Sequence, residues 1–348
     1  MEYPTHDTKE VTIYDIAKEL NISPATVSRG LNDHAAVNKN TKKKILAVAK
    51  EMGYRSNTFA SNLRRQRTHT IGVILPHLNS NFLSAVIAGM EKVANEAGYN
   101  LLISQSLETE KKEIANAKTM FDSRVDGLLV SLAANTASIN HFEPFIKKGV
   151  PIIFFDRVFE HKQCTSIVID NVKAGYEATT HLIAQGGQKI VHITGNLSRN
   201  VYADRLKGYK FALLENGLPY QDENVYSINL TSEIDLNKAL NKILNGKALP
   251  NSLFVANDSC AVSCIKFFKK AGIRIPQDIA IVGFNNDPLA NVIEPNLTTI
   301  DYPGCEMGEV AAKNLINHLN GVHDINSTNT IILRSGLIIR ESSQRKSA

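Results

Sequence analysis

The segment SPATVSRGLN, residues 23–32, combines small and hydroxylated side chains with a single arginine. Hydroxyl groups can bond phosphate oxygens, and the guanidinium of Arg29 can bond the two acceptors on the edge of a guanine. Small side chains would also let a helix that carries them enter a major groove. The chemistry that this segment favours is therefore non-covalent recognition of double-stranded DNA. The residues expected to make contact are Ser23, Pro24, Ala25, Thr26, Ser28, Arg29 and Asn32.

Two short helices would have to position this face. Thr12 stands before the apolar-periodic run IYDIAKEL with an aspartate three residues on, so a mutually capped first helix is expected to begin at Ile13. Asn21 tolerates the positive φ of a sharp turn. Ser23 then caps a second helix that has Pro24 at its first position. This spacing predicts a helix-turn-helix, although a plain helical hairpin with a solvated face has the same pattern.

The excess positive charge of the chain lies in the same region. Residues 1–67 hold 12 Lys and Arg against 7 Asp and Glu, whereas residues 68–348 hold 27 of each. Such a placement is typical of a surface that binds a polyanion. A third helix is predicted in NTKKKILAVAKEMGY, starting at Asn38 and ending at Gly53. The remaining candidate DNA contacts of this region are Thr12, Asn38, Thr41 and Lys42.

The rest of the chain, about 280 residues, is too long for one compact core. Continuous apolar runs alternate with amphipathic segments, which predicts doubly wound parallel sheets in two lobes. The expected strands cover 71–75, 101–104, 127–130, 151–155, 166–169, 190–194, 253–256 and 279–284. The expected helices cover 82–97, 110–121, 171–185, 203–216, 233–245, 258–271 and 304–320.

The run from Val11 to Arg65, leading into IGVILPHLNSNFLSAVIAGMEKVANEAGYNLLI, resembles the LacI/GalR family of transcriptional repressors. The likeness continues to LIIRES at the end of the chain. It implies that the helix-turn-helix binds half of an operator and that a hinge leucine, here Leu63 after Asn57 and Ala60, enters the central minor groove. An apolar side chain between base steps would unstack and bend the duplex. The hinge segment is too short to be a stable helix alone.

The resemblance also implies two lobes like those of periplasmic sugar-binding proteins, joined by three crossovers. We place the crossovers near 160–166, 287–299 and 321–329, because each of these segments has a loop-like composition. The predicted organisation is a helix-turn-helix domain over 1–56, a hinge helix and linker over 57–69, a two-lobed effector-binding and dimerisation domain over 70–341, and a polar tail over 342–348. Lobe 1 is expected to hold about 70–163 and 299–322, and lobe 2 about 164–298 and 323–341.

Ligands of open α/β sheets bind at the carboxyl ends of the strands, so polar residues at those positions are candidates. They are Ser131, Asp156, Arg157, Asn257, Asp258, Asn285 and Asp287. The resemblance adds Phe82, whose ring could cover a sugar face, and Arg205, which stands at the family's effector-binding arginine. Two alternatives stay open: Asp156 or Asp258 could cap the next helix, and Arg205 could pair with an acid across the cleft.

Catalysis has little support, because no nucleophile elbow, zinc-protease motif or phosphate-binding loop occurs. The four cysteines and ten histidines show no metal-ligand spacing, so we expect no metal and no cofactor. No signal peptide or long apolar span is present, which predicts a cytoplasmic protein. A sugar-binding transport protein would need an export signal, and an enzyme would leave residues 1–67 without a role.

The sequence therefore predicts a DNA-binding transcriptional regulator, a repressor of carbohydrate-metabolism genes whose operator binding is modulated by a sugar or sugar phosphate. Control by a nucleobase, a nucleoside or a partner protein is the alternative, and the ligand could either release the protein from DNA or recruit it. One helix-turn-helix reads half of a site, so a homodimer is expected. The resemblance places its contact on the helices near 82–97 and 110–121.

Overall fold

The computed structural model describes residues 11–54 and 67–345, and the chain divides into two units, residues 1–66 and 67–348. The first unit contains the helices α1 (Ile13–Leu20), α2 (Pro24–Leu31) and α3 (Lys39–Glu51). They pack around the fully buried side chains of Ile16, Val27 and Ile45. Asn21 has the left-handed φ of 51° that the sharp turn between α1 and α2 requires. The predicted start of the first helix and the capped start of the second are both confirmed.

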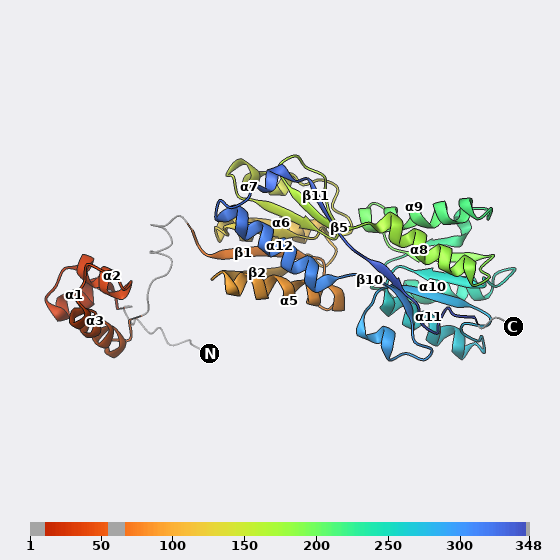
Figure 1. Cartoon of the computed structure of the whole chain (residues 1–348), viewed down its shortest axis with the longest axis horizontal. Coiled ribbons are helices and arrows are strands. Elements are labelled where there is room, and N and C mark those ends of the chain that lie inside the picture. Colours follow the sequence, from red (N-terminus) through yellow and green to blue (C-terminus); the bar gives the residue numbers. More distant parts are fainter. Residues whose placement is uncertain (1–10, 55–66, 346–348) are drawn as a thin grey trace, which may run out of the picture. The chain divides into compact units, whose positions relative to one another are not determined.

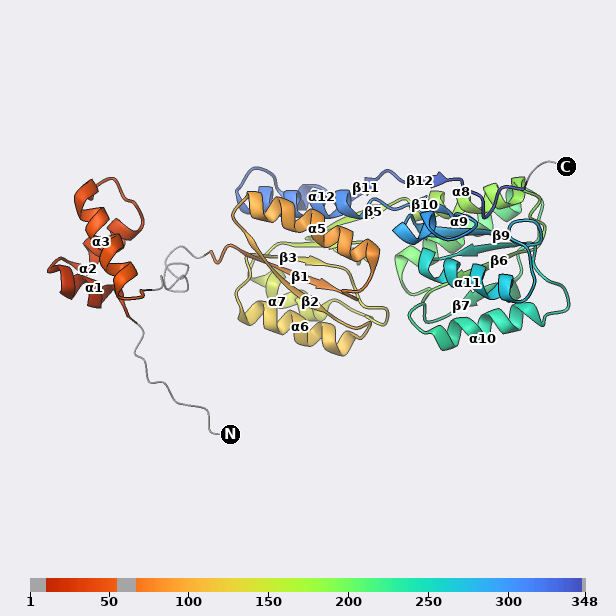
Figure 2. The same ribbon diagram turned by 90° about the horizontal axis from the view of Figure 1, so that it is seen from below.

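The second unit consists of two lobes, each a six-stranded sheet covered by helices on both faces (Figure 1). Lobe 1 has the strand order β11-β5-β4-β3-β1-β2, and all of its strands are parallel. These strands are β1 (Thr70–Leu75), β2 (Asn100–Gln105), β3 (Gly127–Val130), β4 (Ile152–Phe155), β5 (Thr165–Ile169) and β11 (Thr330–Leu333). Figure 2 shows α5 (Asn81–Glu96) and α12 (Gly304–Leu319) on one face and α6 (Glu110–Asp122) and α7 (Glu143–Lys147) on the other.

Lobe 2 has the strand order β12-β10-β9-β8-β6-β7, in which β12 alone is antiparallel to its neighbour. Its strands are β6 (Ile190–Thr194), β7 (Val225–Ser227), β8 (Ser252–Val255), β9 (Ala280–Asn285), β10 (Thr298–Asp301) and β12 (Gly336–Ile338). The helices α8 (Asn171–Ala184) and α9 (Asn200–Glu215) cover one face, and α10 (Glu233–Leu244) and α11 (Asp258–Lys270) cover the other. The doubly wound parallel fold predicted for both lobes is confirmed.

The three crossovers lie later in the chain than predicted. They fall between β5 and α8, between β10 and α12, and between β11 and β12, so lobe 1 holds 70–169 and 304–333 and lobe 2 holds 171–301 and 336–345. The predicted crossovers near 160–166, 287–299 and 321–329 are wrong, because those segments connect elements of the same lobe: β4 to β5, β9 to β10 and α12 to β11. The true crossovers are links of one or two residues, which are too short to have a loop composition of their own.

The described part of the predicted polar tail, residues 342–345, belongs to lobe 2. Ser342 and Ser343 are fully buried. The hydroxyl of Ser342 donates to the carbonyl of Ile281 at 2.7 Å and accepts from the amide of Thr298 at 2.9 Å. Because every polar group of this serine finds a partner, its burial carries no unpaired-group penalty. No described helix is long and apolar enough to cross a membrane.

Candidate functional site

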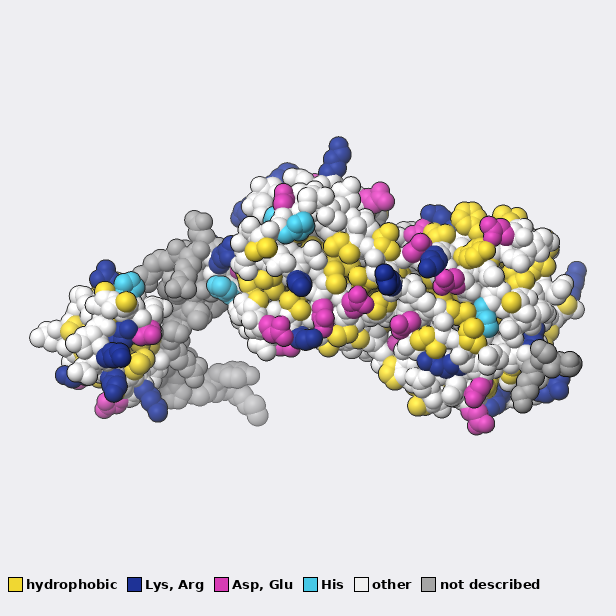
Figure 3. Space-filling view, viewed as in Figure 1, with side chains coloured by type: hydrophobic (Ala, Val, Ile, Leu, Met, Phe, Trp, Pro, Cys, Tyr) yellow, Lys and Arg dark blue, Asp and Glu magenta, His cyan; other side chains and the backbone are white. Residues whose placement is uncertain are grey.

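The outward face of α2 is short and polar, as the sequence predicts. Arg29 is exposed, and Val27 and Gly30 on the opposite side are buried against the other helices. The hydroxyl of Ser23 accepts from the amide of Thr26 at 3.1 Å, which caps the first turn of α2. Figure 3 shows Lys and Arg side chains gathered on this unit. The unit therefore combines an exposed arginine on α2 with further basic side chains on its surface.

Several predicted contact residues of this unit have partners inside it. The ammonium of Lys42 lies 2.6 Å from a carboxylate oxygen of Asp33 and 3.0 Å from the Asp33 carbonyl, so it is less suited to bind phosphate than we expected. Asn32 donates to the carbonyl of Ser28 at 2.8 Å, and Asn38 accepts from the amide of Asn40 at 2.8 Å. The predicted hinge residues Asn57, Ala60 and Leu63 lie outside the described residues.

A cavity of about 930 Å³ lies between the two lobes. Its walls come from the loops that follow β1, β2 and β4 in lobe 1 and from the loops after β6, β7, β8 and β9 in lobe 2. A cavity of this size is ample for a small-molecule ligand. The predicted residues that line it are Phe82, Asp156, Arg157, Arg205, Asn257, Asn285 and Asp287.

Arg205 of α9 is the most deeply buried cation of this wall, with 3% of its surface exposed. Its Nε donates to Asn171 Oδ1 at 2.9 Å and its Nη1 to the carbonyl of Ala256 at 3.0 Å. The guanidinium carbon lies 3.4 Å from the centre of the Phe284 ring. No ion pair joins Arg205 to a described carboxylate, so the alternative of an acid partner is not observed. Burial lowers the pKa of this guanidinium, which a ligand oxygen in the cavity would offset.

Asp156 faces the same cavity from the end of β4. Its backbone has a φ of 58°, and its Oδ1 accepts from the hydroxyl of Tyr302 at 2.7 Å. The ring of Tyr302 stacks on Phe82 with 4.2 Å between the centroids. Ser131 is fully buried beneath Asp156, to which it donates at 3.3 Å, and it does not line the cavity. The prediction of Ser131 as a ligand contact is therefore wrong, because its strand-end side chain points into the protein.

The prediction of Asp258 as a ligand contact is also wrong, because this residue lies behind the cavity wall and is fully buried. Its Oδ1 accepts from the hydroxyl of Thr299 at 2.7 Å, and its Oδ2 accepts from the amide of Asp287 at 2.8 Å. It thus holds the loop after β9 in place. Its neighbour Asn257 lines the cavity and caps α11 by accepting from the amide of Cys260 at 2.7 Å. Burial raises the pKa of Asp258 to about 7 and that of Asp287 to about 6.

We expect Asp258→Asn to gain stability relative to the wild type as the pH rises from 4 to 8. The folded protein keeps the Asp258 proton up to about pH 7, whereas the unfolded chain loses it near 3.8, so the wild-type free energy of unfolding falls across this window. Asparagine can accept from the Asp287 amide through its Oδ1 and donate to the Thr299 hydroxyl through its Nδ2, and it does not ionise. The gain should be roughly 2–4 kcal/mol. Thermal melts of both proteins at several pH values measure it.

Buried His192 contributes a pH dependence of stability with the opposite sign. Burial lowers the pKa of His192 to about 4 from 6.5, so its contribution to stability is lost as the pH falls through this range. This slope opposes that of Asp258, but it is common to both proteins and cancels in their difference. A difference in stability that stayed constant from pH 4 to 8 would show that Asp258 is ionised in the folded protein.

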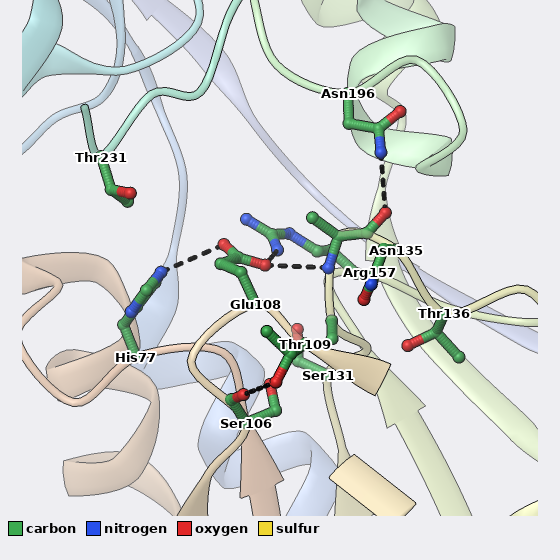
Figure 4. Close-up of polar contacts among 12 residues, drawn as sticks. His77, Ser106, Glu108, Thr109, Ser131, Asn135, Thr136, Arg157, Asn196 and Thr231 are labelled. Carbon is green, nitrogen blue, oxygen red and sulfur yellow. Dashed lines mark hydrogen bonds and ion pairs between the residues drawn. The ribbon is translucent and has the colours of Figure 1, made fainter. Parts of the chain in front are cut away.

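Sequence reasoning missed a polar cluster of lobe 1 that also lines the cavity (Figure 4). The carboxylate of Glu108 lies 2.6 Å from Arg157 Nη1 and 3.2 Å from His77 Nε2, and it accepts from the amide of Ala134 at 2.9 Å. Burial alone would raise the pKa of Glu108, but His77 and Arg157 outweigh it and hold the pKa at about 2. Glu108 follows β2 in the charged run ETEKKE, residues 108–113. Nothing in that run distinguishes it from the other two glutamates as a residue of the cavity.

Other polar residues of the cavity were also missed. Thr231 of the β7–α10 loop faces the cavity opposite His77 (Figure 4). Tyr302 follows β10, a strand that the sequence did not reveal. The further polar residues of the wall are Asn79, Ser80, Asn81, Asn196, Tyr202, Tyr226, Ser227, Asn229, Asp235, Lys238, Lys242 and Ser259. Among the described residues, no group of His, Cys, Asp and Glu could hold a metal ion.

Comparison with known proteins places the chain in a family. The family described as bacterial regulatory proteins of the lacI family matches residues 12–57, and the one described as periplasmic binding proteins and sugar binding domain of LacI family matches residues 68–340. The helix-turn-helix unit and the two-lobed unit correspond to these two matches. The chain belongs to the LacI family and is a DNA-binding transcriptional regulator, not an enzyme.

Curated relatives extend over nearly the whole chain. Catabolite control protein A of Priestia megaterium is 32% identical, over 89% of this chain and 93% of its own. The HTH-type transcriptional regulator RegA of Clostridium saccharobutylicum is 33% identical, over 95% and 98%. The ribose operon repressor of Haemophilus influenzae is 29% identical, over 95% and 98%.

Solved structures share the fold. A lac repressor dimer bound to operator and an anti-inducer matches with a TM-score of 0.83 at 24% identity, over 97% of this chain and 100% of that one. A complex of the transcriptional regulator CelR with cellobiose matches with a TM-score of 0.71 at 24% identity, over 96% and 100%. The fold predicted from the sequence is thus confirmed.

Proposed function

We propose that this regulator represses genes of carbohydrate metabolism and that a sugar or sugar phosphate in the interlobe cavity modulates its binding to the operator. The relatives support this proposal, because they include a ribose operon repressor and a catabolite control protein, and a structural neighbour holds cellobiose. We place the protein in the cytoplasm, where its DNA is.

The observation that carries the proposal is the chemistry of the cavity. Arg205 presents a guanidinium that has no carboxylate partner among the described residues, and Asp156 presents a carboxylate to the same space. Such groups bond sugar hydroxyls in pairs. Phe82, stacked on Tyr302, offers an aromatic surface at the lobe-1 wall. Because Arg205 belongs to lobe 2 and Asp156 to lobe 1, one ligand would contact both lobes. A ligand that prefers one arrangement of the lobes then shifts the population of that arrangement.

A homodimer is part of the proposal. One helix-turn-helix contacts only half of a two-fold symmetric site, and the lac repressor neighbour is a dimer on its operator. The edge strand β2 exposes Leu102 and Ile103, and Ile114 on the adjacent α6 is 45% exposed. An edge strand with exposed apolar side chains needs a cover. We place the contact between copies on this side of lobe 1, formed by β2, α5 and α6.

A ligand screen tests the proposal. Thermal melts of the full chain with ribose, glucose, cellobiose, glucose 6-phosphate and adenine identify the compound that stabilises it, by about 2.7 kcal/mol at a hundredfold excess over Kd. Gel shifts with DNA selected from a random pool by the full chain then measure operator affinity with and without that compound. Stabilisation by adenine alone, or by none of these compounds while DNA binding persists, would contradict the proposed effector class.

We expect Arg29→Ala to lower the discrimination between the selected operator and random DNA. A guanidinium that contacts a base edge carries sequence information worth about 1–3 kcal/mol, and Arg29 is the exposed cation of the α2 face. Competition gel shifts with both DNAs measure the ratio of affinities. Lys18→Ala is the matched control, because it removes an exposed positive charge from α1 rather than from α2. This variant should weaken binding to the operator and to random DNA by the same factor. An unchanged ratio in Arg29→Ala would show that another face reads the bases.

A further inference from the structure

Glu108 occupies a costly position in the loop between β2 and α6. Its φ is 59° and that of the preceding Leu107 is 49°, so two consecutive non-glycine residues adopt the left-handed conformation. Such a conformation is unfavourable for residues with a Cβ and persists where surrounding contacts enforce it. Here the Leu107 amide donates to the carbonyl of Pro76 at 3.0 Å, and the Glu108 carboxylate contacts the neighbouring loops.

The Glu108 carboxylate joins four loops of lobe 1, the ones that follow β1, β2, β3 and β4. It accepts from Arg157 Nη1 at 2.6 Å and from the amide of Ala134 at 2.9 Å, and its other oxygen lies 3.2 Å from His77 Nε2 (Figure 4). Hydrogen bonds that involve ionised groups are about twice as strong as neutral ones. One side chain therefore sets the position of three segments that are far apart in the sequence.

Lobe 2 contacts the same segments. Tyr202 accepts through its hydroxyl from Arg157 Nη2 at 3.1 Å, so Arg157 lies between Glu108 of lobe 1 and Tyr202 of lobe 2. Asn196 donates to the carbonyl of Ala134 at 2.9 Å, and Figure 4 shows this bond beside the one that Ala134 makes with Glu108. Each of these polar contacts between the lobes thus uses a lobe-1 residue that Glu108 holds.

We infer that Glu108 is a positioning residue for lobe closure: its carboxylate fixes Arg157 and the Ala134 segment where Tyr202 and Asn196 of lobe 2 can meet them. Without that charge, the hydrogen bonds that Arg157 and the Ala134 amide donate to this side chain lose about half of their strength, because the acceptor is no longer ionised. The lobes then sample a wider range of orientations. The inference concerns lobe geometry and is independent of the identity of the proposed ligand, so the two can fail separately.

Distance measurements between the lobes test the inference. Nitroxide labels at Lys112→Cys on α6 and Asn241→Cys on α10, in a Cys305→Ser background, report the separation of two helices that lie along the same side of the two lobes (Figure 2). The labelled chain is mixed with a large excess of unlabelled chain, so that each dimer carries one pair of labels. Pulsed electron spin resonance should then give one narrow distance distribution. Glu108→Gln should broaden it and shift it to longer distance.

Glu143→Gln is the matched control, because it removes an equal charge from α7 of lobe 1, where Glu143 pairs with Lys147 of the same helix and contacts no lobe-2 residue among those described. Its distribution should equal that of the wild type. An unchanged distribution in Glu108→Gln, or equal changes in both variants, would overturn the inference.

Tyr202→Phe supplies a second test that leaves lobe 1 intact. It removes only the lobe-2 hydroxyl that meets Arg157, so it should shift the distribution in the same direction as Glu108→Gln. Because both act through Arg157, the double variant should show less than the sum of the two shifts. If Glu108→Gln does not fold, Tyr202→Phe decides alone, and an unchanged distribution would then overturn the inference.

Discussion

Replacing Arg205 by alanine is expected to abolish the response of operator binding to the ligand. Arg205 is the buried cation of the cavity that lacks a carboxylate partner among the described residues, and truncating one member of a buried charged pair costs about 2–5 kcal/mol. Ligand affinity should therefore fall by roughly a hundredfold or more. Calorimetric titration with the sugar that most stabilises the wild type measures this loss. Gel shifts with and without that sugar measure the response.

The direction of the effect on DNA binding depends on what the ligand does. If the ligand is an inducer, Arg205→Ala should bind the operator within a few-fold of the unliganded wild type and stay bound when the sugar is added. For a corepressor, the variant should remain weak on the operator at every sugar concentration. Lys207→Ala is the control, since Lys207 is exposed on the same helix and pairs with Asp204. A normal ligand response in Arg205→Ala would show that the ligand binds elsewhere.

The sequence predicts the long elements of this fold because their periodicity is strong. The strands at 127–130 and 190–194 have the predicted bounds, and the helix starts at Pro24 and Asp258 follow from their capping residues. The short strands β7, β10, β11 and β12 have only three or four residues, and none of them is a continuous run of buried apolar residues. Such short runs have no distinct hydrophobic period, so the sequence does not predict them. Two of the three crossovers follow β10 and β11, and they were misplaced because these strands were not predicted.

The site is predictable to the extent that strand ends define it. Asp156 and Asn257 follow strands and line the cavity, but Ser131 and Asp258 follow strands and turn away from it. The difference lies in local backbone geometry, such as the positive φ of Asp156, which a pattern of residue types does not encode. Glu108 depends on the same geometry and on three distant partners, so sequence spacing gave no indication of it.

Each lobe contains a pair of helices in close contact, and glycines make that approach possible. In lobe 1, α5 and α12 meet at Gly89 and Gly308, and in lobe 2, α8 and α9 meet at Gly175 and Gly208. A Cβ at any of the four would fall on backbone atoms of the facing helix, closer than the 3.0 Å that real Cβ atoms keep. These glycines let each helix pair pack together over its sheet.

Gly308→Ala is accordingly expected to destabilise the protein strongly. Alanine is a better helix former than glycine by about 1 kcal/mol, so an unopposed substitution would stabilise α12. Here the added Cβ meets the carbonyl oxygen of Val86 and the amide nitrogen of Met90, and both belong to the backbone of α5. A helix backbone has no rotamer through which to relax, so α5 and α12 must separate, at a cost of about 3 kcal/mol or more. The melting temperature should fall by roughly 6 °C or more, as followed by circular dichroism. Gly336→Ala in β12 is the control, because nothing lies within 4 Å of its added Cβ. Equal melting temperatures for the two variants would show that α5 and α12 do not need this close contact.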